Sequence, residues 1–144
     1  MSLNFTDLRA ANIERLPLFK NAQGKPAHDQ PDGSDWSPAE WMNAVIGEVG
    51  EAANFLKKWR RGDYPQTVAG AQQFHDDFGK ELADVVIYLD LLAFQLRLDL
   101  GEEVAKKFNQ VSEKQGLPVR LDIALGFVCK ECGRIHDKKM NLQK

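Results

Sequence analysis

The sequence has little of what marks a secreted or membrane-spanning protein. Only two of its 144 residues are cysteines, and no apolar run reaches the roughly 18 residues that a membrane span requires. The N-terminus also lacks the basic segment followed by an apolar one that begins a secretory signal. These absences favour a cytoplasmic protein that does not associate with membranes.

The sequence also has little net charge. A formal charge of −2 gives no general attraction to nucleic acid or to an anionic membrane surface. An apolar content of 43% and a charged content of 28% are ordinary for a globular protein, and the length fits one domain with a real core. Neither nucleic acid nor membrane is therefore expected as a partner.

Apolar periodicity and capping signals predict an all-α fold with four main helices. The strongest start signal is Ser37-Pro38-Ala39-Glu40, a capping box with proline at the first helical position. The predicted helices span about residues 4–16, 37–60, 76–98 and 99–115, with a long loop over 20–35 and an ambiguous stretch over 66–74. The third helix is apolar nearly all round, which is typical of a central helix. The expected core residues of the fourth are Val104, Phe108 and Val111.

Carboxylates fall inside the apolar stripes of the second and third helices. Glu48 and Glu51 share a face with Trp41 and other apolar residues, and Glu81 and Asp84 do the same on the third helix. Unpaired carboxylates in a core-facing stripe are costly, so something cationic must meet them. Two inward acidic pairs supply the hard oxygen ligands that suit Mg²⁺ or Mn²⁺. The alternative is that these acids are solvated. On the third helix, Asp90 is expected to face outward, away from the stripe that carries Glu81 and Asp84.

A different class of enzyme, the di-iron oxidases, also places carboxylates inside a four-helix fold. Such sites use Glu-x-x-His motifs, and no histidine in this sequence follows a glutamate by three residues. The sequence therefore favours Mg²⁺ chemistry over di-iron chemistry.

These motifs resemble the MazG-like branch of the all-α NTP pyrophosphatases. Residues 47–52, Gly-Glu-Val-Gly-Glu-Ala, and residues 81–89, Glu-Leu-Ala-Asp-Val-Val-Ile-Tyr-Leu, are similar to the E-x-x-E and E-x-x-D parts of that family's signature. The resemblance continues through Lys107-Phe108-Asn109 and Ser112 to Gly116-Leu117-Pro118, so it covers about residues 37–118. The spacer between the two motifs is long for the family, and an insertion around residues 63–74 would absorb the difference.

The resemblance implies an oligomeric four-helix MazG-like bundle over residues 1–118, with its core at 37–118 and a short extended tail at 119–144. It implies that the catalytic Mg²⁺ ligands are Glu48, Glu51, Glu81 and Asp84. The implied reaction is attack by a metal-activated water between the α- and β-phosphates of a nucleoside triphosphate, which yields a monophosphate and pyrophosphate. A role in clearing the nucleotide pool follows. A phosphoribosyl-nucleotide pyrophosphohydrolase is the alternative. A homodimer or homotetramer is also implied, because one copy leaves a face of the central helix uncovered.

Candidate substrate contacts come from both helices and loops. Lys58 lies about two turns, or ~10.5 Å, beyond Glu51 on the same face and could reach a phosphate. The resemblance adds Lys107 and Asn109. The alternative for Lys58 is that it and its basic neighbours favour the helix C-terminus and stay in water. Trp36 is the most accessible aromatic candidate for contact with a base. Other candidates, which are more often core residues, are Trp41, Trp59 and Tyr88.

The tail carries a second motif. Residues 119–127 alternate apolar and other side chains, which predicts an extended segment. Cys129, Cys132 and His136 then follow with the spacing of half a zinc ribbon, and a fourth ligand is missing unless Asp137, His28 or another subunit supplies it. The alternatives are a polar tail with free thiols and a non-enzymatic interaction module built on the zinc tail.

Overall fold

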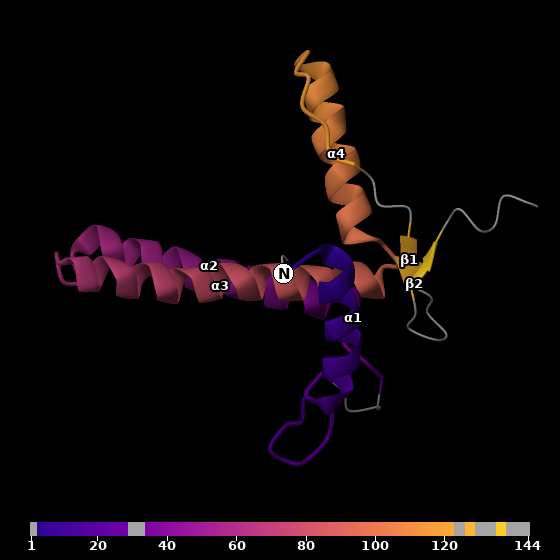
Figure 1. The fold of residues 1–144 in the computed structure, drawn as a ribbon. Coiled ribbons are helices and arrows are strands. Elements are labelled where there is room, and N and C mark those ends of the chain that lie inside the picture. The colour runs from indigo at the N-terminus through magenta and orange to yellow at the C-terminus, as the bar shows by residue number, and fades with distance from the viewer. Residues whose placement is uncertain (1–2, 29–33, 123–125, 129–134, 138–144) are drawn as a thin grey trace, which may run out of the picture. The chain divides into compact units, whose positions relative to one another are not determined.

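The computed structural model describes residues 3–28, 34–122, 126–128 and 135–137. It confirms the all-α class, with two three-residue strands added near the C-terminus (Figure 1). Among the residues described, no helix is long and apolar enough to cross a membrane. The elements in chain order are α1 (Phe5–Arg15), the 3-10 helix η1 (Leu16–Leu18), α2 (Pro38–Arg61), α3 (Val68–Gln95), α4 (Leu100–Lys114), β1 (Gly126–Val128) and β2 (Ile135–Asp137).

The chain divides into two compact units, and α3 contributes to both. One unit comprises residues 28–92, and the other combines residues 1–27 with residues 93–144. All four predicted metal ligands and all three tryptophans belong to the first unit. The domain boundary predicted at residue 118 stays a prediction.

Local capping signals decide where α2 begins and ends. The Ser37 hydroxyl accepts from the Glu40 amide, and the Glu40 carboxylate accepts from the Ser37 amide, so the predicted capping box is confirmed. Gly62 ends the helix with φ of 80°, a left-handed conformation that glycine adopts without steric cost. Asn4 and Asp99 likewise cap α1 and α4 through their side chains. The starts of these three helices, and the end of α2, are therefore determined by signals within a few residues.

The third helix is longer than predicted at its start. Most of the ambiguous stretch at 66–74 is helical, because α3 begins at Val68 and ends at Gln95. The Thr67 hydroxyl accepts from the Gly70 amide, which satisfies a donor of the first turn. A Cβ added at Gly70 would lie 2.0 Å from the Pro65 carbonyl oxygen, so the chain can turn into α3 this closely only with glycine there.

Two pairs of aromatic rings show that α2 and α3 run antiparallel. The Trp41 ring lies 6.1 Å from the Tyr88 ring, and the Trp59 ring lies 4.5 Å from the Phe74 ring. The start of α2 therefore lies beside the second half of α3, and its end lies beside the start of α3. Residue 50, midway between the two tryptophans, lies level with residue 81, midway between their partners.

Burial contradicts three sequence expectations. Asp90 is buried, with only 1% of its surface exposed, so its predicted outward position is wrong. In α3, Leu82 and Val86 are exposed although the helix was expected to be covered on several sides. The predicted core residues of α4 are exposed as well, and its buried residues are Ala105 and Ser112. A helix that is apolar nearly all round gives no sequence signal for which side is covered, and a partner can cover a stripe that one chain leaves open.

Polar contacts connect the segments of the second unit to one another. The Arg9 guanidinium donates to the Leu98 carbonyl oxygen at 3.2 Å and lies 5.5 Å from the centroid of the Phe94 ring. The Asn109 side chain donates to and accepts from the backbone of Leu121, at 2.8 and 2.7 Å. These contacts fasten α1 to the end of α3, and the segment after α4 to α4 itself.

Strands β1 and β2 form an antiparallel pair in which Phe127 lies opposite His136. Strand β1 overlaps only the end of the stretch 119–127 that was predicted to be extended, and residues 123–125 of that stretch lie outside the described residues. Cys129 and Cys132 lie outside the described residues, so the zinc site predicted from them stays a prediction.

Candidate active site

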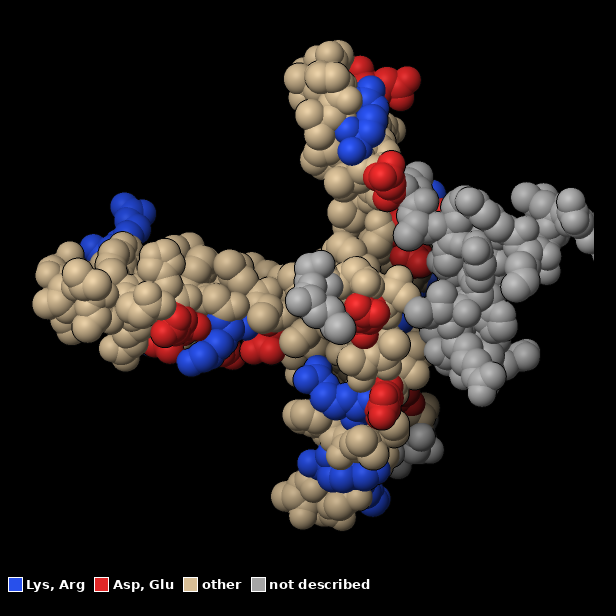
Figure 2. Space-filling model, in the orientation of Figure 1, with Lys and Arg blue, Asp and Glu red and all other residues tan. Residues whose placement is uncertain are grey.

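Three glutamates from two helices meet near the middle of the α2–α3 pair. Glu48 and Glu51 lie one turn apart on α2, and Glu81 lies at the matching level of α3. One carboxylate oxygen from each lies within 4.8 Å of the other two. Figure 2 shows acidic side chains gathered along one edge of this pair, with basic ones among them. We call Glu48, Glu51, Glu81 and Asp84 the acidic cluster.

Desolvation, together with repulsion from neighbouring carboxylates, raises the pKa of two members of the acidic cluster. Desolvation, followed by the charges of Glu51, Asp84 and Glu81, raises the pKa of Glu48. Desolvation and the charges of Glu51, Asp84 and Asp77 raise the pKa of Glu81, and Lys80 opposes them. Asp84 therefore lies close enough to act on both glutamates, although it is not one of the three whose oxygens converge. A divalent cation would relieve this repulsion.

The acidic cluster is more accessible than the sequence predicted. Glu51 is exposed, while Glu48, Glu81 and Asp84 are half-buried rather than enclosed in the core. A carboxylate set at the edge of a helix pair keeps room for water and for a phosphate beside the ion. The donor set, at least three carboxylates from two rigid helices, fits the ligands that Mg²⁺ and Mn²⁺ prefer.

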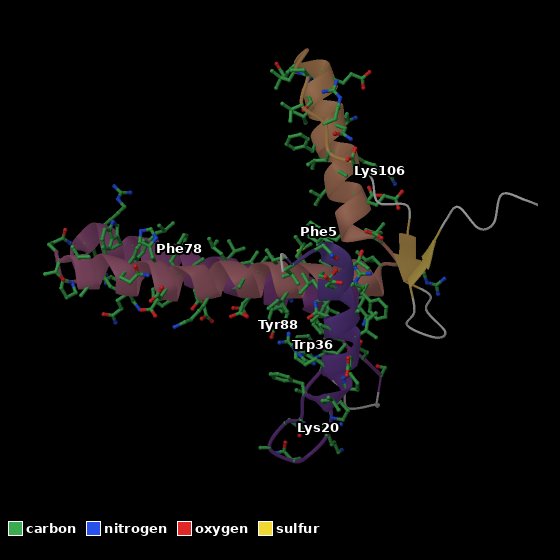
Figure 3. All side chains as sticks on the ribbon, viewed as in Figure 1. Phe5, Lys20, Trp36, Phe78, Tyr88 and Lys106 are labelled. Atoms are coloured by element: carbon green, nitrogen blue, oxygen red, sulfur yellow. The ribbon has the colours of Figure 1, made fainter. Side chains whose placement is uncertain are left out.

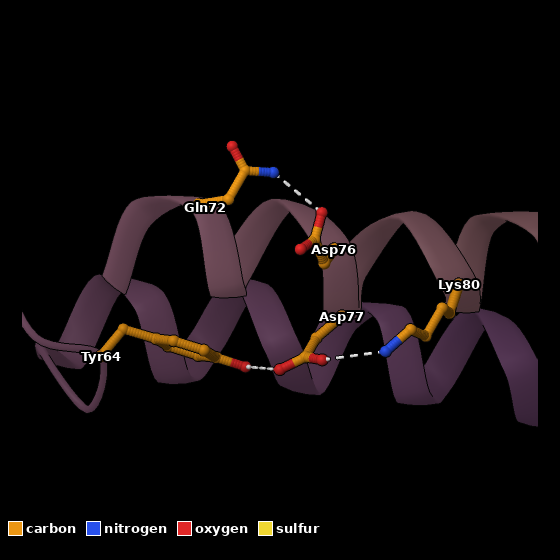
Figure 4. A network of polar contacts seen from close by, with 5 residues as sticks. All are labelled: Tyr64, Gln72, Asp76, Asp77 and Lys80. Carbon is orange, nitrogen blue, oxygen red and sulfur yellow. Dashed lines mark hydrogen bonds and ion pairs between the residues drawn. The ribbon is translucent and has the colours of Figure 1, made fainter. Parts of the chain in front are cut away.

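A polar network that the sequence reasoning missed borders the acidic cluster (Figure 4). The Tyr64 hydroxyl donates to one Asp77 oxygen at 3.4 Å, and the Lys80 ammonium lies 3.4 Å from the other. Burial is the main cause of a raised pKa of the Tyr64 hydroxyl, and the charge of Asp77 raises that pKa further. Asp77 could have been found from sequence, because it lies one turn before Glu81 on the same face of α3.

The predicted phosphate-binding residues are divided between the two compact units. The Lys58 ammonium lies 4.9 Å from the centroid of the Phe55 ring, one turn beyond Glu51 on α2. Lys107 and Asn109 belong to α4 in the other compact unit. There Lys107 donates to the Gln110 side chain, and Asn109 bonds to the Leu121 backbone. Only Lys58 therefore shares a compact unit with the acidic cluster.

Four aromatic rings lie at the opposite end of the acidic cluster from Lys58. Trp41 stacks on His28 with ring centroids 4.8 Å apart, and Trp36 meets both rings edge-on. Tyr88 joins them from α3, and Figure 3 shows Tyr88 and Trp36 near each other. Trp41 lies two turns before Glu48, and Tyr88 one turn beyond Asp84. Trp36 is half-buried in this group, whereas Trp41 is buried beneath the other rings.

Comparisons with known proteins find similarity to nucleotide pyrophosphatases. The chain is similar to dCTP pyrophosphatase 1 of Bos taurus and of Mus musculus, with 33% and 34% identity over 100 residues that cover 67% of this chain and 56% of each relative. It is also 34% identical over 79 residues to dCTP pyrophosphatase 1 of Homo sapiens, covering 52% of this chain and 46% of that protein. The chain thus spans about half the length of the curated relatives it matches. No family model and no solved structure match it. What it resembles over two thirds of its length is a family of nucleotide pyrophosphatases.

Proposed function

We propose that this protein is a Mg²⁺-dependent nucleoside triphosphate pyrophosphohydrolase, which converts a (d)NTP and water into a (d)NMP and pyrophosphate. The observation that carries the proposal is the convergence of Glu48, Glu51 and Glu81 from two antiparallel helices. The dCTP pyrophosphatases to which the chain is similar support the same reaction class. Their name makes dCTP the first substrate to test.

Different residues along the helix pair would bind different parts of the substrate. The acidic cluster would hold Mg²⁺, which when bound supplies charge neutralisation at the phosphates and a more acidic water. Beside the buried Trp41, two turns from Glu48, the half-buried rings of Trp36 and Tyr88 offer faces against which a base could stack. Trp36 is the half-buried tryptophan of that group, which favours it as the one that contacts a base.

Hydrolysis forms one P–O bond to the water oxygen and breaks one P–O bond of the α–β bridge. The water protons pass to the two products and to solvent.

The bond that is cleaved decides this proposal. With Mg²⁺, dCTP or another nucleoside triphosphate is expected to yield the monophosphate and pyrophosphate in equal amounts. Ca²⁺ should support far less turnover, because it is larger and less strictly octahedral than Mg²⁺. Chromatography of the nucleotide products from a panel of NTPs, dNTPs and phosphoribosyl nucleotides, with a pyrophosphate assay, measures both. A diphosphate and orthophosphate as main products would contradict the proposal.

We also propose that the protein assembles with further copies of itself through α2 and α3. Both helices carry an exposed apolar stripe about half a turn around from Glu51 and Asp84, and assembly through it would leave the acidic cluster accessible. Its members are Met42, Ile46, Val49 and Leu56 on α2 and Leu82 and Val86 on α3. Two such pairs packed together make a four-helix bundle, for which a second copy supplies the missing half.

Light scattering after size exclusion is expected to give at least a dimer for the parent protein. Replacing Ile46, which is 60% exposed, with glutamate should shift the protein toward monomer, because a charge in an apolar interface is desolvated without a partner. The matched control is Val119→Glu, since Val119 is 59% exposed and lies after α4, outside both α2 and α3. A monomeric parent, or equal behaviour of the two variants, would rule out this interface.

For the tail, Cys129, Cys132 and His136 remain our proposed ligands for a structural Zn²⁺. The proposal is supported by their spacing alone. The zinc content of protein prepared without chelators tests it directly, and metal-free protein with two titratable thiols would contradict it.

A further inference from the structure

Lys80 is held at one end of the acidic cluster. It lies between the candidate ligand Glu81 and the network of Tyr64 and Asp77, and its charge acts on Glu81. Figure 4 shows its side chain running back along α3 toward Asp77. Its ammonium is therefore displaced toward the start of α3, away from the aromatic rings.

The ammonium group of Lys58, on α2, lies at the same level along the helix pair as the ammonium group of Lys80 on α3. Residue 50 of α2 lies level with residue 81 of α3, and Trp59 lies beside Phe74, so Phe55 lies level with about residue 77. The Lys58 ammonium lies over the Phe55 ring, and the Lys80 ammonium lies beside Asp77. The two cations therefore lie at one level, about one turn (~5.4 Å) beyond the glutamates.

The two lysines also lie on the edge of the helix pair that carries the acids. Lys58 follows Glu51 by seven residues, or about two turns of α2, and Lys80 precedes Asp84 by four residues, or about one turn of α3. Glu51 in turn acts on Glu81 across the pair. One edge thus presents, in order, aromatic rings, carboxylates and two ammonium groups.

This order gives a bound nucleotide a direction. If the base stacks at the aromatic end and the α–β bridge lies at the acidic cluster, the β- and γ-phosphates extend toward the lysines. Ammonium groups are strongly hydrated point charges that bind phosphate oxygens well. The reverse direction would place the apolar base faces beside two cations and the polyphosphate beside aromatic rings.

We propose that Lys80, together with Lys58, binds the pyrophosphate half of the substrate, and that Tyr64 and Asp77 position Lys80 for this role. The inference rests on the proposed function and extends it to the orientation of the substrate. Asp77 limits the conformations of a long side chain before substrate arrives, and the Tyr64 hydroxyl orients the carboxylate. The phosphate oxygens then replace or share Asp77 as the partner of the ammonium.

The ion pair of Lys80 with Asp77 is expected to add little to the stability of the fold. An exposed lysine paired with a carboxylate three residues away contributes little to stability. Lys106 provides an example on α4, where it pairs with Glu102 and Glu103. Removing Lys80 is therefore expected to leave the unfolding transition nearly unchanged, while it weakens a contact with pyrophosphate.

The test compares inhibition by the two products. With Mg²⁺ present, Lys80→Ala is expected to weaken product inhibition by pyrophosphate about tenfold and leave inhibition by the nucleoside monophosphate unchanged, because one charged hydrogen bond is lost at one end of the site. Lys80→Arg should restore much of the pyrophosphate affinity. Tyr64→Phe should weaken it in the same direction by about threefold, since it removes only a neutral donor to Asp77. The control is Lys57→Ala, which removes an exposed lysine on α2 that points about 100° away from Lys58.

Unchanged inhibition by pyrophosphate in Lys80→Ala would overturn the inference, and so would equal weakening for both products. If no nucleoside triphosphate is hydrolysed at all, the proposed function fails instead. Calorimetric binding of magnesium pyrophosphate to the parent and to Lys80→Ala then still decides the role of Lys80. The two failures are in this way distinguishable.

Discussion

Replacing Glu51 with glutamine is expected to lower the rate of nucleotide hydrolysis by roughly 100-fold or more. Glutamine keeps the volume of the side chain, but its neutral amide binds Mg²⁺ poorly and does not help to position a water. Glu51 converges with Glu48 and Glu81 within 4.8 Å, so its loss leaves two of the three oxygens. Steady-state rates over a range of Mg²⁺ concentrations measure the effect.

The same substitution should act in the opposite direction on stability. Without metal the variant is expected to be as stable as the parent or more stable by ~1 kcal/mol, because one of several repelling charges is removed. Mg²⁺ should then raise the melting temperature of the parent more than that of the variant, since a ligand stabilises the folded state in proportion to its affinity. Thermal melts with EDTA and with Mg²⁺ give both comparisons.

The pH dependence of stability in EDTA provides a further readout of this variant. A carboxyl whose folded pKa lies above its ordinary value binds more protons when folded, so stability falls as the pH rises through the window between the two values. Glu48 is such a group, with an ordinary value of 4.5 raised by burial and by the facing charges of Glu51, Asp84 and Glu81. The metal-free parent should therefore lose stability from about this pH upward, and Glu51→Gln should lose less.

A matched control for Glu51→Gln cannot be Asp90→Asn, because Asp90 is buried. Asp76→Asn serves instead, since Asp76 is exposed on α3 and accepts from the Gln72 side chain at 2.9 Å. Its activity and its response to Mg²⁺ should match those of the parent. Equal behaviour of Glu51→Gln and Asp76→Asn would show that Glu51 is an ordinary surface residue and that the acidic cluster holds no catalytic metal.

Replacing Trp41 with alanine is expected to destabilise the protein by about 3–5 kcal/mol, the largest stability effect that we foresee. Trp41 is 0% exposed, and three aromatic rings lie against it, those of His28 and Trp36 from the segment before α2 and that of Tyr88 from α3. Alanine would leave a cavity at the point where these segments meet. Urea unfolding at one fixed protein concentration measures the change, because assembly makes stability concentration-dependent.

Two comparisons separate the loss of packing at Trp41 from a general effect of substitution. Trp41→Phe should retain much of the stability, because it keeps an aromatic ring at the same place. Val68→Ala, at a position that is 90% exposed, should change stability by about 0.5 kcal/mol or less. A loss at Trp41→Ala no larger than that at Val68→Ala would mean that the aromatic group does not hold the two helices together.

Local signals in the sequence were sufficient for the helices that begin with a strong cap. Ser37, Asn4 and Asp99 each satisfy backbone donors within three residues of themselves, so the start of a helix can be read from a short segment. The start of α3 could not be read in this way. It depends on Gly70 fitting against the Pro65 carbonyl, which is a contact between a turn and the helix that follows it.

Burial was predicted least well where the apolar pattern was strongest. In α3 nearly every side of the helix carries apolar residues, so the apolar pattern does not distinguish the side of the buried Asp90 from the side of the exposed Leu82 and Val86. In α4 the stripe of Val104, Phe108 and Val111 is clearly amphipathic, but a stripe shows only that some surface must cover it. Which surface does so is a property of the folded or assembled molecule.

The sequence by itself determined the helices apart from the start of α3, the spacing of Glu48, Glu51, Glu81 and Asp84, and the chemistry that carboxylates at that spacing favour. These follow from the 3.6-residue period and from ligand preference, both of which are local. The tertiary structure alone decided that the two acidic pairs meet, because that depends on the antiparallel register set by Trp41 with Tyr88 and Trp59 with Phe74. It alone also placed Lys58 and Lys80 at one level, since side chains from different helices are brought together only by the packing between them.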